Sequence, residues 1–376
     1  MRNLTVPPVI RRAMSVGAVL ACSISGGKDS DALTRKLATW AAANGWTPQL
    51  FALHMDLVRM EWQETPAQVE RIASENGLPL VVTKRPQGDL LQEIEDRMEK
   101  LAGTNKPFWP SAAQRYCTAD QKRSQADKVY RDVESHVPFW PSAAQRYCTA
   151  HHKTNQADKV YRNHSLIISA EGNRAQESTK RQKDPVVSVR KQITAERLKD
   201  LPVEEAFWQW LVINELIDRD LPLPDGWGHY LREKRPRLAI TWYAIHDFEL
   251  EDVWQTCGTS GAELEQRRAI YRQAWDMSTT PWTLVNPEKI TESLDGWPCH
   301  PAYVYGNERV SCVLCILATK NDLGNGARHQ PETLHHLIDL EERGGSTFKH
   351  GWSLSELLQQ PEPDTRPQQL ALFCED

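Results

Sequence analysis

The feature that most constrains the fold is a glycine loop, Ser25–Ser30 (S-G-G-K-D-S), set between a strand-like run and a helix-like run. Residues 18–24 are almost continuously apolar, which is typical of a parallel strand buried on both faces. Residues 31–43 carry apolar side chains on one side of a helix, and Gly45 ends that helix. A strand, a glycine loop and a helix start together present backbone amides and a helix dipole to an anion. The sequence therefore predicts an α/β fold with a phosphate-binding loop.

More strands and helices alternate along the chain. Strands are expected at residues 50–55, 80–83 and 166–170, and helices at 66–76 and 89–101. This alternation predicts a doubly wound parallel sheet, in which ligands bind beyond the carboxyl ends of the strands. Ser25, Asp56 and Gly172 each follow such an end, so we expect them to meet at one crevice.

A segment between the third and fourth strands is repeated. Residues 107–131 and 138–162 are identical at 21 of 25 positions, which indicates a tandem duplication, because a solenoid needs more units. The second copy runs directly into the fourth strand, so we expect it to line the site. Its candidate nucleotide-binding and metal-binding residues are Arg146, Cys148 and Lys153.

The remaining sequence suggests two regions. Residues 1–255 form a nucleotide-binding domain that includes a helical insertion at 201–237, which is rich in tryptophan, proline and charge. Residues 256–376 form a cysteine-bearing region with a mobile tail.

Composition narrows the class of protein. A net charge of −5 argues against a surface coated in basic residues, although residues 180–199 hold a basic run that is either a solvated face or a nucleic-acid contact. We find no apolar stretch long enough for a membrane span and no export signal, so the expected location is cytoplasmic. Eight cysteines in such a chain indicate thiols or a metal site and not a disulfide scaffold.

The glycine loop has side chains suited to phosphate. Lys28 can make charge-assisted contacts of roughly 1.5–3 kcal/mol each, and Asp29 can hold Mg²⁺ or orient the loop. We expect Lys28 to be a surface charge that would lack a partner in the crevice without phosphate. The loop is not a Walker A loop, which has four residues between its first glycine and the Gly-Lys pair. The other phosphate-binding residues of the loop are Ser25, Gly26, Gly27 and Ser30.

The loop resembles the PP-loop of the adenine-nucleotide α-hydrolase superfamily, which includes ATP sulfurylase small subunits, tRNA thiolation enzymes and the phosphoadenosine phosphosulfate (PAPS) reductase family. Other segments between about residues 17 and 320 resemble the PAPS reductase family. They are H-M-D at 54–56, R-Y-C-T at 115–118 and 146–149, E-G-N-R-A-Q-E-S at 171–178 followed by Arg181, and the segment at 246–254.

The resemblance implies roles for individual residues. Arg174 and Arg181 suit phosphate or sulfonate, because a guanidinium forks onto two oxygens. Glu177 pairs with one of these arginines or holds a metal, and Gly172 allows backbone contact with the nucleotide. The expected catalytic residues are Lys28, Asp29, Arg174 and Glu177. The expected nucleotide-binding residues outside the loop are Asp56, Arg146, Lys153, Gly172, Arg174, Ser178 and Arg181.

Four cysteines form a second candidate site. The C-x-x-C pair Cys312 and Cys315 follows Cys299 and, further back, Cys257. Four thiolates can bind an iron–sulfur cluster or Zn²⁺, and the resemblance favours iron–sulfur. Alternatives stay open here: a metal-free buried pair, Cys117 or Cys148 in place of Cys257, or a zinc site completed by His300 or His246.

The resemblance implies an enzyme that uses ATP and Mg²⁺. It would cleave ATP between the α and β phosphates and adenylate an acceptor, which a sulfur-donor protein then attacks. The sequence does not distinguish DNA, tRNA, a small molecule or a protein thiol as that acceptor. One alternative is a true PAPS reductase with a C-terminal cysteine nucleophile; Cys374 is present, but the Glu-Cys-Gly-x-His arrangement is not. PAPS has no β–γ pyrophosphate, so a reductase loop has little use for Lys28 and Asp29. A second alternative is an inert subunit that senses nucleotide or binds nucleic acid.

Overall fold

A computed structural model gives the structure of the protein. It describes residues 2–101, 153–162, 164–214, 236–279, 282–349 and 352–358. Most of the sequence repeat, the second half of the 201–237 insertion and the tail lie outside these ranges, together with Arg146, Cys148, Cys117 and Cys374.

The core of the fold is a six-stranded sheet with the strand order β3-β2-β1-β4-β6-β5. Its strands are β1 (Val19–Ile24), β2 (Leu50–Met55), β3 (Leu80–Thr83), β4 (Leu166–Ala170), β5 (Val187–Val189) and β6 (Leu238–Trp242). All neighbours are parallel except β5, which runs antiparallel to β6 at the edge. The predicted α/β fold with a doubly wound parallel sheet is therefore confirmed. Strand β5 was missed, because three half-buried residues give too short a pattern to recognise.

Alternate residues of the central strands pack on opposite faces of the sheet. Leu20, Cys22 and Ile24 of β1 belong to the larger hydrophobic cluster, whereas Ala21 belongs to a smaller cluster that includes Tyr161. This alternation follows from the two-residue period of a strand. Both faces are covered, which explains the continuous apolar runs in the sequence.

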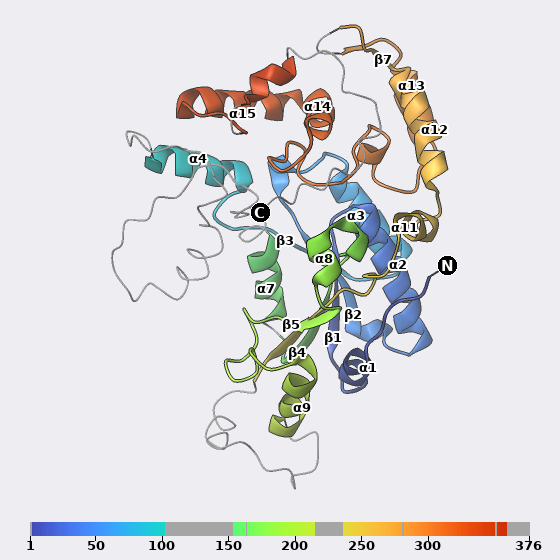
Figure 1. The fold of residues 1–376 in the computed structure, drawn as a ribbon, viewed down its shortest axis with the longest axis vertical. Coiled ribbons are helices and arrows are strands. Elements are labelled where there is room, and N and C mark those ends of the chain that lie inside the picture. Colours follow the sequence, from blue (N-terminus) through green and yellow to red (C-terminus); the bar gives the residue numbers. More distant parts are fainter. Residues whose placement is uncertain are drawn as a thin grey trace.

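Helices surround the sheet (Figure 1). The helices of the first 101 residues are α1 (Pro8–Ser15), α2 (Lys28–Ala43), α3 (Thr65–Glu75) and α4 (Leu90–Leu101). Those of the middle are α7 (Asn155–Tyr161), α8 (Thr179–Lys183), α9 (Val203–Ile213) and α11 (Leu250–Thr256). Those that follow are α12 (Gly261–Arg272), α13 (Glu288–Leu294), α14 (Lys320–His329) and α15 (Pro331–Gly344). Short 3₁₀ turns include η2 (Val58–Met60), η4 (Ala175–Glu177) and η5 (Pro301–Tyr303), and β7 (Trp275–Asp276) pairs with β8 (Thr283–Leu284).

The region after residue 255 shares the hydrophobic core of the sheet domain. Tyr303 and Leu337 lie in the same hydrophobic cluster as Leu20 and Trp254. The expected boundary at 255/256 falls at the end of α11. In the described part, the cysteine-bearing region is therefore packed against the sheet domain.

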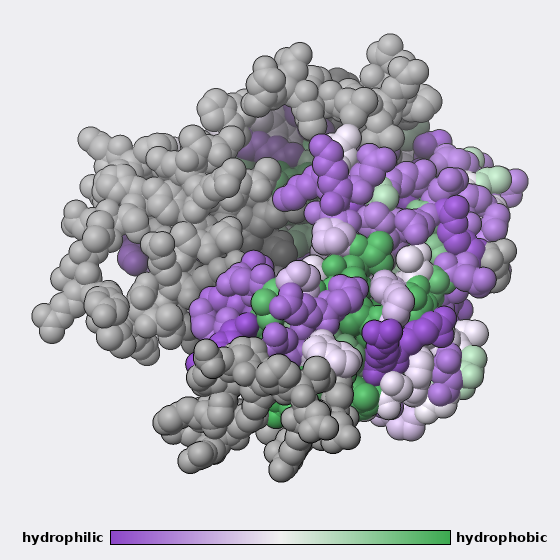
Figure 2. All heavy atoms as spheres, turned by 60° about the horizontal axis from the view of Figure 1, so that its bottom comes forward, coloured by the Kyte–Doolittle hydropathy of each residue, from purple (hydrophilic) through white to green (hydrophobic). Residues whose placement is uncertain are grey.

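The 201–237 insertion begins with a packing helix. Helix α9 contacts β5 and β6, and the Trp210 indole N–H donates to the carbonyl of Pro236 over 2.9 Å. On the face in Figure 2, hydrophilic residues cover most of the described surface, with a smaller hydrophobic group in its middle. None of the helices in the described ranges combines the length and apolar character needed to cross a bilayer.

Candidate active site at the carboxyl edge of the sheet

The glycine loop lies where the strand order reverses, between β1 and α2. Strand β1 sits between β2 and β4, with Ile24 level with His54 and Cys22 level with Ala170. The segments that follow these three strands therefore leave the sheet along the same edge, where ligands bind in open α/β sheets. Gly26 has a φ of +75°, a backbone conformation that favours glycine.

Backbone amides at the start of α2 are available to an anion. The Lys28 amide donates to the Tyr303 hydroxyl over 3.0 Å, while the amides of Asp29 and Ser30 donate to no acceptor within the described ranges. The Ser30 hydroxyl donates to the Gly27 carbonyl and accepts from the Ser25 amide, so it holds the loop in shape. The loop thus keeps free amides at the positive end of a 16-residue helix.

Three charged side chains form a chain across the loop. Lys28 is 5% exposed, and its ammonium lies 2.9 Å from one Asp29 carboxylate oxygen. The other Asp29 oxygen accepts from Arg174 Nε over 2.5 Å. Although burial alone would raise the pKa of Asp29, the charges of Lys28 and Arg174 hold it below its usual value. Two sequence expectations are corrected here: Lys28 is buried, and Asp29 supplies its counter-charge.

Aromatic rings enclose the Lys28 ammonium. It lies 5.2 Å from the Tyr303 ring centroid and 5.7 Å from that of Trp254, within the range of cation–π attraction. The two rings meet edge to face. Lys28 is therefore held by its neighbour Asp29 and by aromatic residues from two distant parts of the chain.

Gly172 lets the segment after β4 approach the loop. A Cβ at this position would lie 3.1 Å from the backbone carbon and oxygen of Asp29 and 3.2 Å from the Ser30 nitrogen. The backbone of the glycine loop therefore leaves no space for a Cβ at position 172. Any larger residue would push the two segments apart.

The residues after Gly172 form a local ion network. Arg174 is 4% exposed and directed at Asp29, whereas Arg181 makes an ion pair with Glu177. The Glu177 carboxylate also accepts from the Arg174 amide over 3.2 Å. The Ser178 hydroxyl accepts from the Arg181 amide and caps α8. Arg174 thus links this network to the loop through Asp29.

Asp56 lies at the end of β2 beside two other possible metal ligands. Its carboxylate accepts from the Val58 amide over 2.7 Å, and Val58 has a φ of +55°, which is strained for a β-branched residue. Ligand atoms of His54, Asp56 and Glu61 lie within 4.8 Å of one another. Although burial opposes protonation, the hydrogen bond to Glu61 raises the pKa of His54.

The described end of the second repeat copy is part of the sheet domain. Asp158 accepts from Arg190 over 2.7 Å, and the same guanidinium bonds Glu171 at the end of β4. Lys153 is near enough to Cys315 for its charge to affect that thiol. Arg146 and Cys148 lie outside the described residues, so their positions stay predictions.

The four predicted cysteine ligands form two pairs. Cys257 and Cys299 are buried side by side, and the neighbouring Cys299 thiol together with burial raises the pKa of the Cys257 thiol well above its usual range. Cys312 and Cys315 are half-buried, and their hydrogen bond lowers the pKa of Cys315 to about 6. One ligand atom from each of Asp31, Cys257 and Cys299 lies within 4.8 Å of the other two. In the described ranges, no set of four thiols is that closely spaced.

Neither histidine proposed for a zinc site has a free ring nitrogen. His300 accepts from the Ala302 amide at Nδ1 and bonds the Thr65 hydroxyl at Nε2, while burial lowers its pKa to about 3. The nitrogens of His246 face Asp247 and the Arg181 carbonyl.

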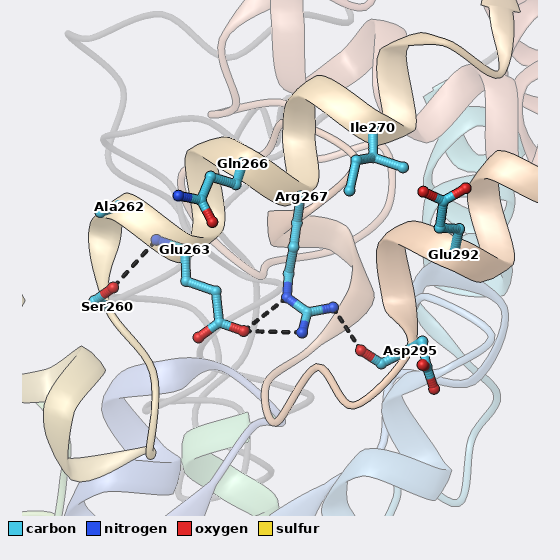
Figure 3. Close-up of a pocket in the computed structure, with 8 residues that line it drawn as sticks. All are labelled: Ser260, Ala262, Glu263, Gln266, Arg267, Ile270, Glu292 and Asp295. Atoms are coloured by element: carbon cyan, nitrogen blue, oxygen red, sulfur yellow. Dashed lines mark hydrogen bonds and ion pairs between the residues drawn. The ribbon is translucent and has the colours of Figure 1, made fainter.

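The hollow of about 540 Å³ between α12 and α13 does not include the loop. Figure 3 shows Arg267 reaching from α12 to Glu263 on the same helix and to the backbone of Asp295 beyond α13. The residues that line this hollow all lie between 260 and 295, and none of the residues predicted for catalysis is among them.

A comparison with protein families gives one match. Residues 108–266 match the model of the phosphoadenosine phosphosulfate reductase domain. The match supports the PAPS reductase family. Within the described ranges it runs from α7 into the first half of α12, and so contains Gly172, Arg174 and Trp254 but not the glycine loop. Members of this family are enzymes that bind adenine nucleotides. No curated protein matches the chain significantly.

Sequence reasoning did not assign Tyr303 and Trp254 to the loop. Trp254 belongs to the segment at 246–254 that resembles the PAPS reductase family, and this resemblance was the only sequence feature that connected Trp254 with the site. Tyr303 is 275 residues from Lys28, in a short apolar turn with no pattern that indicates a site.

Proposed function

We propose that the chain binds ATP with Mg²⁺ at the glycine loop and cleaves it between the α and β phosphates, adenylating an acceptor during sulfur transfer. The observation that carries the proposal is the convergence at the start of α2. The unclaimed amides of Asp29 and Ser30 adjoin two buried cations, Lys28 and Arg174. Amides, a helix dipole and fixed cations together suit the charge of a polyphosphate and of its cleavage transition state.

The residues present suit particular roles in this reaction. Lys28 would contact phosphate oxygens at the cost of part of its bond to Asp29. Arg174 would keep Asp29 ionised and oriented, and a released Asp29 oxygen could join the Mg²⁺ coordination. Asp56, with His54 and Glu61, is a second set of donors for the cation at the neighbouring strand end. The acceptor proposed is a nucleic acid, either DNA or tRNA, with a sulfur-donor protein as partner.

An iron–sulfur cluster is the second part of the proposal, with Zn²⁺ as the alternative. Thiolate donors suit an iron–sulfur cluster or Zn²⁺. The Cys312–Cys315 pair supports the proposal best, because Lys153 of the second repeat copy is near enough for its charge to act on Cys315. The sequence placed Cys257 and Cys299 in the same set of four thiolates, but in the described ranges they group with Asp31 and not with Cys312 and Cys315, so the proposed cluster rests on the Cys312–Cys315 pair. When bound, the cluster would supply a thiophilic surface for a sulfur atom.

The cluster can be tested by anaerobic purification followed by a visible spectrum and an iron count. We expect a brown protein that contains iron, and loss of both signals in the Cys312→Ser, Cys315→Ser double variant. Cys22→Ser is the matched control, since Cys22 is buried in β1 against Thr34. Stoichiometric zinc without iron would replace the cluster with a zinc site.

The second candidate function is PAPS reduction with release of sulfite. The description of the matched family, a PAPS reductase domain, favours it. The two reactions differ in their products, so the deciding assay is whether the protein converts ATP to AMP and pyrophosphate. Nucleotide binding without turnover would instead support an inert sensing subunit.

A further inference from the structure

Three segments meet at a buried cluster behind the glycine loop. Asp31 comes from the first turn of α2, Cys257 follows α11, and Cys299 precedes η5. These residues are only 1%, 2% and 3% exposed, respectively. One ligand atom from each lies within 4.8 Å of those of the other two. This cluster is distinct from the Lys28–Asp29–Arg174 chain, because the Asp31 carboxylate pairs with Arg35 and Arg71.

Asp31 holds an unsatisfied polar atom in this cluster. Its Oδ1 accepts from Arg35 Nε over 2.7 Å. Its Oδ2 is buried and accepts no hydrogen bond in the described part, and the Arg71 guanidinium lies 3.7 Å away. A buried polar atom without a partner costs about 1–3 kcal/mol, so such an atom calls for a ligand.

The donor set selects the chemistry of that ligand. Two cysteine sulfurs and a carboxylate suit a thiophilic divalent cation, whereas Mg²⁺ and Ca²⁺ prefer oxygen donors. Two thiolates, one carboxylate and a dication leave one negative charge, which the Arg35 guanidinium balances. Arg35 also fixes the orientation of the carboxylate, as outer partners of metal ligands do.

We propose that Asp31, Cys257 and Cys299 bind a thiophilic divalent cation of the Zn²⁺ class, which fastens the region after residue 255 to the back of the glycine loop. Binding releases one proton from each thiol to solvent, the two sulfurs and the carboxylate each form a bond to the cation, and no electron is transferred. The proposal does not rest on the reaction at the loop.

The position of the cluster explains what the cation would stabilise. Cys257 Sγ lies 3.5 Å from the Lys28 carbonyl, at the base of the loop. Cys299 precedes His300, whose ring lies 3.5 Å from the position of a Cβ on Gly26. A bound cation would therefore hold α11 and η5 against the loop at two points.

A disulfide between the two cysteines accounts for less of the structure. It would leave Asp31 Oδ2 without a partner, and both thiols are too buried to meet an oxidant readily. The metal site satisfies all three side chains at once.

The test is a Co²⁺ titration of the full-length chain after chelator treatment under reducing conditions, followed by thiolate-to-cobalt absorption. It is done in the Cys312→Ser, Cys315→Ser background, which removes the other cysteine pair. We expect one Co²⁺ per chain with a thiolate signal, which Zn²⁺ displaces. Adding Cys257→Ser or Cys299→Ser should remove about half of the signal per ion, because one of two thiolates is lost.

Asp31→Asn preserves the size of the side chain and both thiols, so it keeps the proposal testable if a cysteine variant fails to fold. It should weaken Co²⁺ binding by about 10- to 100-fold while leaving the thiolate absorption in place at saturation. Cys22→Ser is the control and should bind as tightly as the background. A folded background protein without cobalt–thiolate absorption, a signal unchanged by Cys257→Ser and Cys299→Ser, or a Cys257–Cys299 disulfide in the reduced sample would overturn the proposal.

Discussion

The glycine-loop crevice and the α12–α13 hollow use charged residues in opposite ways. At the loop, Lys28 and Arg174 are buried, and the Asp29–Arg174 bond joins residues 145 positions apart. In the hollow, Arg267 pairs with Glu263 one helical turn away, and Glu292 pairs with Lys289 on an exposed surface. Buried charges cost free energy unless each has a partner, so a chain retains them where chemistry needs them. We therefore expect converging buried charges to mark the active site better than open volume does.

The largest effect should come from the loop lysine. Lys28→Met keeps the packing against Trp254 and Tyr303 but removes the charge. We expect ATP turnover to fall by roughly 10- to 150-fold, since a charge-assisted contact contributes about 1.5–3 kcal/mol. The measurement is pyrophosphate release at saturating ATP.

Lys36→Met is the matched control for this variant. Lys36 lies on the same helix and also faces an aromatic ring, Phe248, at 5.9 Å. ATP turnover by the Lys36→Met variant should stay at the level of the unmodified protein. Equal pyrophosphate release by Lys28→Met and Lys36→Met would contradict the special role of Lys28, because a lysine outside the loop would then matter as much.

A smaller effect is expected where the two loop segments touch. Gly172→Ala places a Cβ 3.1 Å from the Asp29 backbone, so the loop or the segment after β4 must shift. We expect a loss of about 1–3 kcal/mol in the free energy of unfolding, together with weaker nucleotide binding. Denaturant unfolding and a nucleotide titration measure the two.

Gly324→Ala tests the same change where it fits. A Cβ there meets only the end of Arg328, at 3.6 Å, within helix α14. It should leave nucleotide binding unchanged and should not destabilise the fold. If Gly172→Ala behaves in the same way, the close approach at Gly172 is unimportant for the site.

The smallest effect should come from the hollow. Glu292→Gln removes an exposed charge whose pair with Lys289 contributes at most about 1 kcal/mol. Pyrophosphate release should be unchanged. A drop comparable to that of Lys28→Met would mean that the hollow takes part in catalysis and that the comparison is wrong.

The sequence predicted the parts of the fold that local patterns encode. Four parallel strands and the glycine loop were recognisable because buried strands are apolar runs and phosphate loops need glycine. Asp56 and Gly172 followed from the rule that ligands bind at the carboxyl ends of strands.

Long-range contacts could not be predicted in the same way. Tyr303 reaches the Lys28 amide from 275 residues away, and Asp31 turns from the loop motif to two distant cysteines. The division of the cysteines into two pairs also depends on how η5 packs on the loop, which their spacing does not encode. Partners of this kind are set by tertiary packing and leave no periodic signal.

The central claim is that the loop acts on ATP, and a direct competition tests it most sharply. Purified protein is given ATP with Mg²⁺ in one assay and PAPS with a thiol reductant in the other, and pyrophosphate and sulfite are measured. We predict AMP and pyrophosphate from ATP, lost in Lys28→Met, and no sulfite above background. Robust sulfite release that survives Cys315→Ser and disappears with Cys374→Ser would contradict the claim and identify a PAPS reductase.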